Sequence, residues 1–156
     1  MKTFLQAHAS HADPAKALAS AGAQIEAQRR LPGRAAHPTL GWLYLTDHYA
    51  AHAEALLAQV QQRWPGVQWV GAVGIGVAAG GQEHFDAPAL SLMLAELPAA
   101  EFRVFSGALP LADFSAYTAQ VHADPSSEEL PELIKDMSQR TATGYLFGGL
   151  ASARTR

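Results

Sequence analysis

The chain has 156 residues, 49% of them hydrophobic, with a formal charge of −3 and no cysteine. This composition fits one globular domain with a core. The lack of a basic stripe argues against a nucleic-acid partner. The lack of cysteine excludes disulfides, thiolate metal sites and a cysteine nucleophile. No run approaches the ~18 apolar residues of a membrane span, and His8 and His11 interrupt the N-terminal apolar patch, so we expect a single cytoplasmic domain over residues 1–156.

The chain opens with a predicted strand and helix. The segment KTFLQAHAS, residues 2–10, has the apolar centre that is typical of a strand. Asp13 is a good N-cap, and Pro14 suits the first position of a helix because its missing N–H would have no partner there. The alanine-rich segment that follows predicts a helix over residues 15–30.

A second strand and helix follow. Residues 39–48, TLGWLYLTDH, are apolar at almost every position, which is typical of a strand covered on both faces. Residues 49–64 carry apolar side chains at helical spacing, and the Pro-Gly pair at 65–66 ends that helix. We expect Leu43 and Val70 to lie in neighbouring strands inside the sheet, because a strand–helix–strand unit makes a parallel pair.

A glycine-rich stretch spans residues 70–81, VGAVGIGVAAGG. A dinucleotide-binding turn needs G-x-G-x-x-G before a helix, but here the spacing is G-x-x-G-x-G and no amphipathic helix follows. A Walker loop needs Gly-Lys-Ser/Thr, and no lysine lies between Lys16 and Lys135. We interpret the glycines as shaping a bent strand or the wall of a small-molecule pocket.

The second half of the chain predicts strands broken by one helix. Strands are expected at residues 89–97, 101–109 and 144–148, a short helix opens at Pro131, and residues 109–122 are ambiguous. The predicted order is β-α-β-α-β-β-β-α-β. The fold class is therefore α/β, with a mixed sheet covered by helices.

Two patterns along the chain point to a family. The first runs from GWLYLTDHY through the helix and the glycine-rich strand to LSLMLAELP, and the second is DPSSEELPELIKDMSQRTATGYLFGGLAS, which ends in GG-x-x-S. In this order they resemble the N-terminal domain of the FIST family, the small-ligand sensory domains of bacterial signal-transduction proteins. The resemblance implies a sensory module that binds a small molecule such as an amino acid. It also implies that the chain is the N-terminal part of a longer two-domain architecture.

Ligands of open α/β sheets gather beyond the carboxyl ends of parallel strands, and this rule and the resemblance together select a site. FIST members often carry polar residues in the glycine-rich strand, where this chain has Ala72, Val73 and Gly74, so other segments or the backbone must contact the ligand. The predicted ligand-binding residues are His8, Asp47, His48, Gly74, Gly76, Gly148 and Gly149.

Seven histidines in a chain without cysteine raise the question of a metal or haem. His48 and His52 are four residues apart, which on a helix places both on one face, although no glutamate stands between them as in zinc proteases. Their simpler interpretation is two surface histidines, and we predict no metal site and no cofactor. Because some FIST members are described as haem-based sensors of nitric oxide, haem is an alternative, with His8, His48, His52 or His84 as axial ligand.

An enzyme with a polar site at the carboxyl ends of the strands is the last alternative. Asp47 and His48 could act as orienter and base, but adjacent strand residues point to opposite faces, and there is no Gly-x-Ser-x-Gly elbow. We therefore predict a sensory module that is not an enzyme. Its expected partners are a small-molecule ligand and a C-terminal FIST-type domain or a signalling output protein, with a homodimer as a further option and neither nucleic acid nor membrane.

Overall fold

The computed structural model describes residues 3–106 and 111–154, which fall into two compact units. Unit 1 comprises Met1–Ala99 and Ala153–Arg156, and unit 2 comprises Ala100–Ser152. Helices and both parallel and antiparallel strand pairs are present, which confirms the α/β fold class with mixed pairing. The single domain expected over residues 1–156 stays a prediction.

Unit 1 is built on a four-stranded mixed sheet with the order β1-β6-β2-β3. Its strands are β1 (Leu5–Ser10), β2 (Leu40–Thr46), β3 (Gln68–Gly74) and β6 (Ala89–Ala95). The strands β2 and β3 are parallel, as expected for strands joined through a helix, and β6 is antiparallel to both β1 and β2. The strand β6 therefore separates β1 from β2, although the sequence places β1 and β2 one after the other.

The strand β2 lies inside this sheet and is buried at every position except Tyr44. Leu43 and Val70 lie in neighbouring parallel strands, as predicted, because Trp42 pairs with Val70 and Leu43 pairs with Gly71. The prediction that both strands lie inside the sheet is wrong for β3, which is the last strand of the described order. The chain leaves the sheet after Gly74 and returns as β6 on the other side of β2, so nothing in the described sheet pairs with the outer edge of β3.

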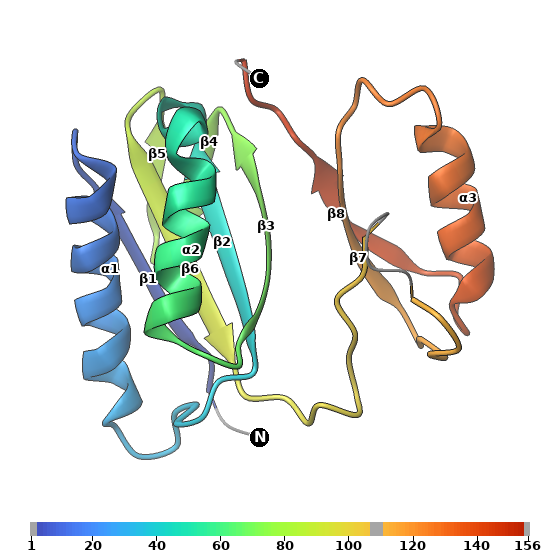
Figure 1. Cartoon of the computed structure of the whole chain (residues 1–156), viewed down its shortest axis with the longest axis horizontal. Helices are drawn as coiled ribbons and strands as arrows, with labels where there is room; N and C mark the ends of the chain where they lie inside the picture. Colours follow the sequence, from blue (N-terminus) through green and yellow to red (C-terminus); the bar gives the residue numbers. More distant parts are fainter. Residues whose placement is uncertain (1–2, 107–110, 155–156) are drawn as a thin grey trace. The chain divides into compact units, whose positions relative to one another are not determined.

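Two helices cover one face of the sheet, which we call the helix face, and Figure 1 shows them side by side in front of it. The helix α1 (Pro14–Arg29) begins after Asp13, whose side chain accepts hydrogen bonds from two backbone N–H groups, so the predicted cap and helix are confirmed. The helix α2 (Ala53–Arg63) follows a 3-10 helix, η1 (Asp47–His52), where the sequence predicted one continuous helix from residue 49. Between helices and sheet lies the core, which includes Leu5, Ile25, Leu56, Val60, Leu90, Leu92 and Leu94.

The glycine-rich stretch forms the end of β3 and then a hairpin of two strands, β4 (Gly76–Ala79) and β5 (Gln82–Phe85). Gly80 and Gly81 make its turn with φ of 59° and 78°, a pair of left-handed conformations that glycine adopts at low cost and that suits a two-residue hairpin loop. Side chains alternate along β1, so His8 points away from the helix face. The hairpin contacts His8, so it lies on the opposite face of the sheet, which we call the hairpin face.

Unit 2 contains the helix α3 (Leu130–Arg140) and a parallel pair of strands, β7 (Ala119–Ala123) and β8 (Leu146–Leu150). The helix expected at Pro131 is confirmed, and the strand expected at 144–148 is confirmed with a shift of its bounds. The strand expected at 101–109 is wrong for residues 101–106, which pair with no strand, and 107–109 lie outside the described residues. An alternating pattern alone does not make a strand, because a strand needs a partner for its backbone hydrogen bonds.

Candidate functional site

The predicted ligand site lies where the parallel strands β2 and β3 end. Thr46, the last residue of β2, pairs with Gly74, the last residue of β3. Asp47 follows directly and begins η1, so its carboxylate lies at the edge of the sheet where α/β proteins bind ligands. The Asp47 side chain is only 4% exposed. A carboxylate buried this deeply requires a cation or several hydrogen bonds as partners.

Arg154 supplies these partners. Its Nε donates to Oδ2 of Asp47 at 2.7 Å and its Nη2 donates to Oδ1 at 3.0 Å, a bidentate arrangement, and its backbone N–H faces Oδ2 at 3.3 Å. Nη2 also lies 2.8 Å from Oδ1 of Asp86, so one guanidinium bridges two carboxylates. The hydrogen bonds from the Arg154 side chain hold the pKa of Asp47 at about 2.

Sequence reasoning selected Asp47 but missed Arg154 and Asp86. Arg154 is 107 residues from Asp47, and no local pattern links them. Asp86 follows β5 directly and has a φ of 54°, an uncommon value for a residue with a side chain. Its backbone N–H faces the carbonyl oxygen of Ile75 at 3.4 Å, which places it at the base of the hairpin.

His48 and His52 lie beside this site but do not form a pair. The sequence argument treated Asp47 and His48 as strand residues on opposite faces, but β2 ends at Thr46, and Nδ1 of His48 lies 3.4 Å from Oδ1 of Asp47. His48 and His52 are both exposed and lie in η1. A 3-10 helix has three residues per turn, so residues four apart point about 120° away from each other, and the α-helical spacing that would place both histidines on one face does not apply here.

Gly74 and Gly76 flank Ile75, where the chain turns from β3 into the hairpin. A Cβ atom on Gly76 would lie 3.0 Å from the carbonyl oxygen of His84 and 3.2 Å from the Phe85 ring. Glycine at this position therefore lets β5 lie close to β4. The structure brings Gly74 and Gly76 to the same end of the sheet as Asp47, and contact with a ligand stays a prediction for all three.

The structure groups His8 with the hairpin. Nδ1 of His8 lies 3.0 Å from Nε2 of His84, and the Gly80 turn lies over the same ring, where a Cβ atom would be 3.2 Å from Nε2 of His8. The His8–His84 contact joins β1 to β5 of the hairpin, where His84 pairs with Val77. Ligand contact at His8 stays a prediction.

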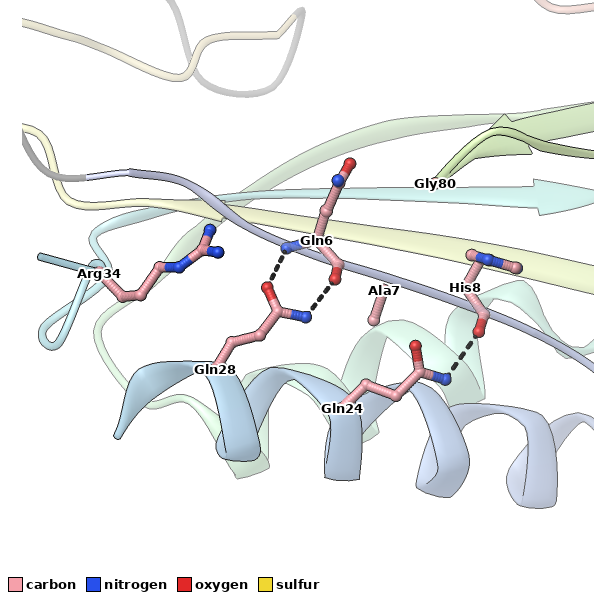
Figure 2. A pocket seen from close by; sticks show the side chains of 7 residues that line it. All are labelled: Gln6, Ala7, His8, Gln24, Gln28, Arg34 and Gly80. Carbon is pink, nitrogen blue, oxygen red and sulfur yellow. Dashed lines mark hydrogen bonds between the residues drawn. The ribbon is translucent and has the colours of Figure 1, made fainter. Parts of the chain in front are cut away.

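A hollow of about 280 Å³ lies beside His8, at the free edge of β1 (Figure 2). Gln28 of α1 donates to the backbone oxygen of Gln6 at 2.6 Å and accepts from its N–H at 3.1 Å, as a neighbouring strand would. Gln24 donates to the backbone oxygen of His8 at 2.9 Å. The residues that line the hollow are Gln6, Ala7, His8, Gln24, Gln28, Arg34 and Gly80.

This polar lining does not fit a haem, because the amide and guanidinium groups around His8 do not match the apolar faces of a porphyrin. A haem on His48, His52 or His84 stays a prediction. Within the described part of the chain, no three side chains of His, Cys, Asp or Glu are grouped so that they could hold a metal ion together.

Gly148 and Gly149, the remaining predicted ligand residues, lie in β8 of unit 2. Gly148 has a φ of 134° and pairs with Val121 so closely that a Cβ atom would collide with the Val121 carbonyl group. A Cβ atom on Gly149 would meet no other group. The structure thus gives Gly148 a role in the pairing of β7 with β8, and ligand contact at either glycine stays a prediction.

Comparison with known proteins identifies the family of this chain. The family model described as the FIST N domain matches residues 39–156, from the start of β2 through both units. The chain belongs to the FIST N domain family. This family is associated with sensory roles in signal transduction. Neither the comparison with curated proteins nor that with solved structures found a match.

The matched part of this FIST N domain includes Asp47, Asp86, Arg154 and His84, whereas His8 and α1 precede it. Among the residues that the structure describes, no helix is both long and apolar enough to cross a membrane.

Proposed function

We propose that this FIST N domain is a sensory module of bacterial signal transduction that binds a small molecule at the carboxyl ends of β2 and β3. The observation that carries the proposal is the Asp47 carboxylate, which is 4% exposed and held by a guanidinium. Burying a charge is costly without a partner of opposite charge, so a fold that keeps a carboxylate here is built to receive a cation. Arg154 now fills that role from within the chain.

The contacts of Arg154 indicate which ligands suit the site. Its guanidinium bridges Asp47 and Asp86, and the Arg154 side chain is itself 53% exposed, so the site opens to solvent. A ligand that carries a primary amine or a guanidinium can bond to the same carboxylates when Arg154 moves away. Amino acids with a basic side chain and related metabolites are therefore the ligand class that we propose, in line with the amino acids that the family resemblance implies.

The proposed activity is binding without catalysis. The pKa of Asp47 is held at about 2 by the hydrogen bonds from Arg154. A general base works best when its pKa lies near the pH of the reaction, and a carboxylate with so low a pKa accepts a proton poorly. The charge of Asp47 therefore supports recognition of a cation rather than proton transfer.

A ligand screen tests this proposal. Thermal unfolding of the full chain is followed with lysine, arginine and agmatine, and with uncharged norleucine as the control ligand. Arg154→Ala should strengthen binding of the cationic ligands by removing the internal competitor, and Asp47→Asn should abolish it. The matched control is Arg140→Ala, because Arg140 also pairs with an aspartate, at 2.8 Å, but on the exposed surface of α3. Binding that survives Asp47→Asn, or no shift with any of the cations, would overturn the proposed site.

The same proposal places the protein in the cytoplasm. It gives it a C-terminal FIST-type domain or a signalling output protein as partner, with a homodimer as the further option. Support for a protein partner comes from unit 2, where Tyr145, Phe147 and Leu150 are 64%, 48% and 51% exposed. Large apolar side chains are rarely left in water as a group unless another surface covers them. Light scattering of the purified chain distinguishes a homodimer from a monomer.

A further inference from the structure

Two histidines that are 76 residues apart in the chain face each other on the hairpin face of unit 1. Nδ1 of His8, in β1, lies 3.0 Å from Nε2 of His84, in β5. The ring centroids are 5.2 Å apart and the ring planes are inclined by 48°. Both residues are half-buried, and neither takes part in the proposed site at Asp47.

The distance between these two nitrogens matches the separation of two neighbouring ligand atoms on one transition-metal ion. Imidazole nitrogens bind such ions at about 2.0 Å. Two ligands at that distance are about 2.8 Å apart when their bonds make a right angle, as in square-planar and octahedral sites, and about 3.3 Å apart at the tetrahedral angle. The observed 3.0 Å lies between these two values, so the pair can reach either geometry.

We propose that Nδ1 of His8 and Nε2 of His84 form a two-histidine binding site for a divalent transition-metal ion, with Cu²⁺ as the preferred ion. Cu²⁺ binds nitrogen ligands more tightly than the other divalent ions of its series. No third histidine or carboxylate of the described chain joins the pair in a metal-binding group. Water therefore fills the remaining positions, and the ion exchanges readily with chelators.

The proton shared between the two facing nitrogens does not prevent an ion from binding. One of the two facing nitrogens must now carry a proton and donate it to the other, because two lone pairs at 3.0 Å would repel each other. When an ion binds, that proton moves to the other nitrogen of its own ring, and the two rings turn so that both lone pairs meet at the ion. Gly80 leaves room over the His8 ring, since a Cβ atom there would lie 3.2 Å from Nε2.

An ion at this position would join β5 of the hairpin to β1. The hairpin has only two strands and a Gly-Gly turn, and the His8–His84 contact links it to the sheet. Because the two ligands come together only in the folded chain, binding must raise the stability of the fold. A rise in melting temperature with CuCl₂ is therefore a second readout, independent of spectroscopy.

The experiment titrates the full chain with CuCl₂ in a buffer that does not coordinate copper, by calorimetry and by electron paramagnetic resonance. His8→Gln and His84→Gln keep a side chain that can hydrogen-bond to the remaining imidazole but bind copper poorly. The double variant His37→Gln/His52→Gln is the matched control, because it also removes two histidines, both of them exposed. We expect one reversible Cu²⁺ per chain, a spectrum with two coordinated nitrogens, and at least about tenfold weaker binding in each pair variant but not in the control.

Two results would overturn the proposal. The first is equal copper affinity in the wild type and His84→Gln, which would mean an adventitious ion only. The second is a wild-type spectrum without two coordinated nitrogens, and this measurement decides even where a variant fails to fold. Binding of basic amino acids should be the same in His84→Gln and in the wild type, so failure of the copper site and failure of the proposed function are separate outcomes.

Discussion

Arg154 bonds to both carboxylate oxygens of Asp47, through Nε at 2.7 Å and Nη2 at 3.0 Å. These bonds hold the pKa of Asp47 at about 2, below its ordinary value of 3.8. A carboxyl group whose pKa is lower in the folded chain stabilises the fold above its unfolded pKa, and this contribution is lost as the pH falls through the folded pKa. We therefore expect the contribution of Asp47 to be complete above about pH 5 and to fade between about pH 4 and pH 2.

Urea unfolding at a series of pH values measures this effect. The difference in free energy of unfolding between the wild type and Asp47→Asn should be largest near neutral pH and should shrink as the pH approaches 3. Asp136→Asn serves as the control, because Asp136 pairs with Arg140 in an exposed position where salt and water screen the charge. A difference for Asp47→Asn that stays constant with pH would contradict the assignment.

Gly71 lies so close to β2 that a Cβ atom would collide with the carbonyl group of Leu43. Gly71→Ala must push β3 away from β2 or distort the strand, and forcing an extra methyl group into a packed site typically costs about 1–3 kcal/mol. Gly149→Ala is the matched control, because the added methyl group would meet no other group. Chemical denaturation of both variants should show a clear loss only for Gly71→Ala, and equal stabilities would show that β3 does not depend on this close approach.

Tyr49 is 1% exposed and joins η1 to the loop after β1. Its hydroxyl donates to the carbonyl oxygen of His11 and lies 3.4 Å from the His11 backbone N–H. Tyr49→Phe leaves that carbonyl without its partner, so we expect a loss of about 1–2 kcal/mol in the free energy of unfolding. Tyr117→Phe, at a position that is 76% exposed, should change the stability little. Unfolding in urea that is identical for both variants would argue against the hydrogen bond.

Local signals along the chain predicted the elements that depend on few neighbours. Asp13 and Pro14 indicated the start of α1, and the continuous apolar run around Leu43 indicated a buried strand. The pair Gly80–Gly81 is also a local hairpin signal, because a Gly-Gly pair between two short strands is typical of a tight turn. These features are decided within a few residues of the chain, by capping, turn conformation and alternation.

The candidate sites depend on contacts between residues that are far apart in the sequence, and no local pattern predicts such contacts. The position of β6 between β1 and β2 decides which residues face each other, and it places Ser91 opposite both His8 and Tyr44. Contacts such as His8 with His84 and Asp47 with Arg154 join residues that are 76 and 107 positions apart. Residues 101–106 show the converse, since alternation predicted a strand where the structure forms none.

The last prediction concerns the free edge of β1. Gln28 bonds to both the N–H and the carbonyl group of Gln6, and so occupies positions that a neighbouring strand would otherwise take (Figure 2). Open strand edges pair readily with other chains, and covering such an edge is a common protection. We expect Gln28→Ala to increase self-association relative to the wild type at the same concentration, as measured by light scattering. Gln59→Ala, at an exposed position of α2, should leave association unchanged. If Gln28→Ala associates no more than the wild type over a wide concentration range, the glutamine does not protect this edge.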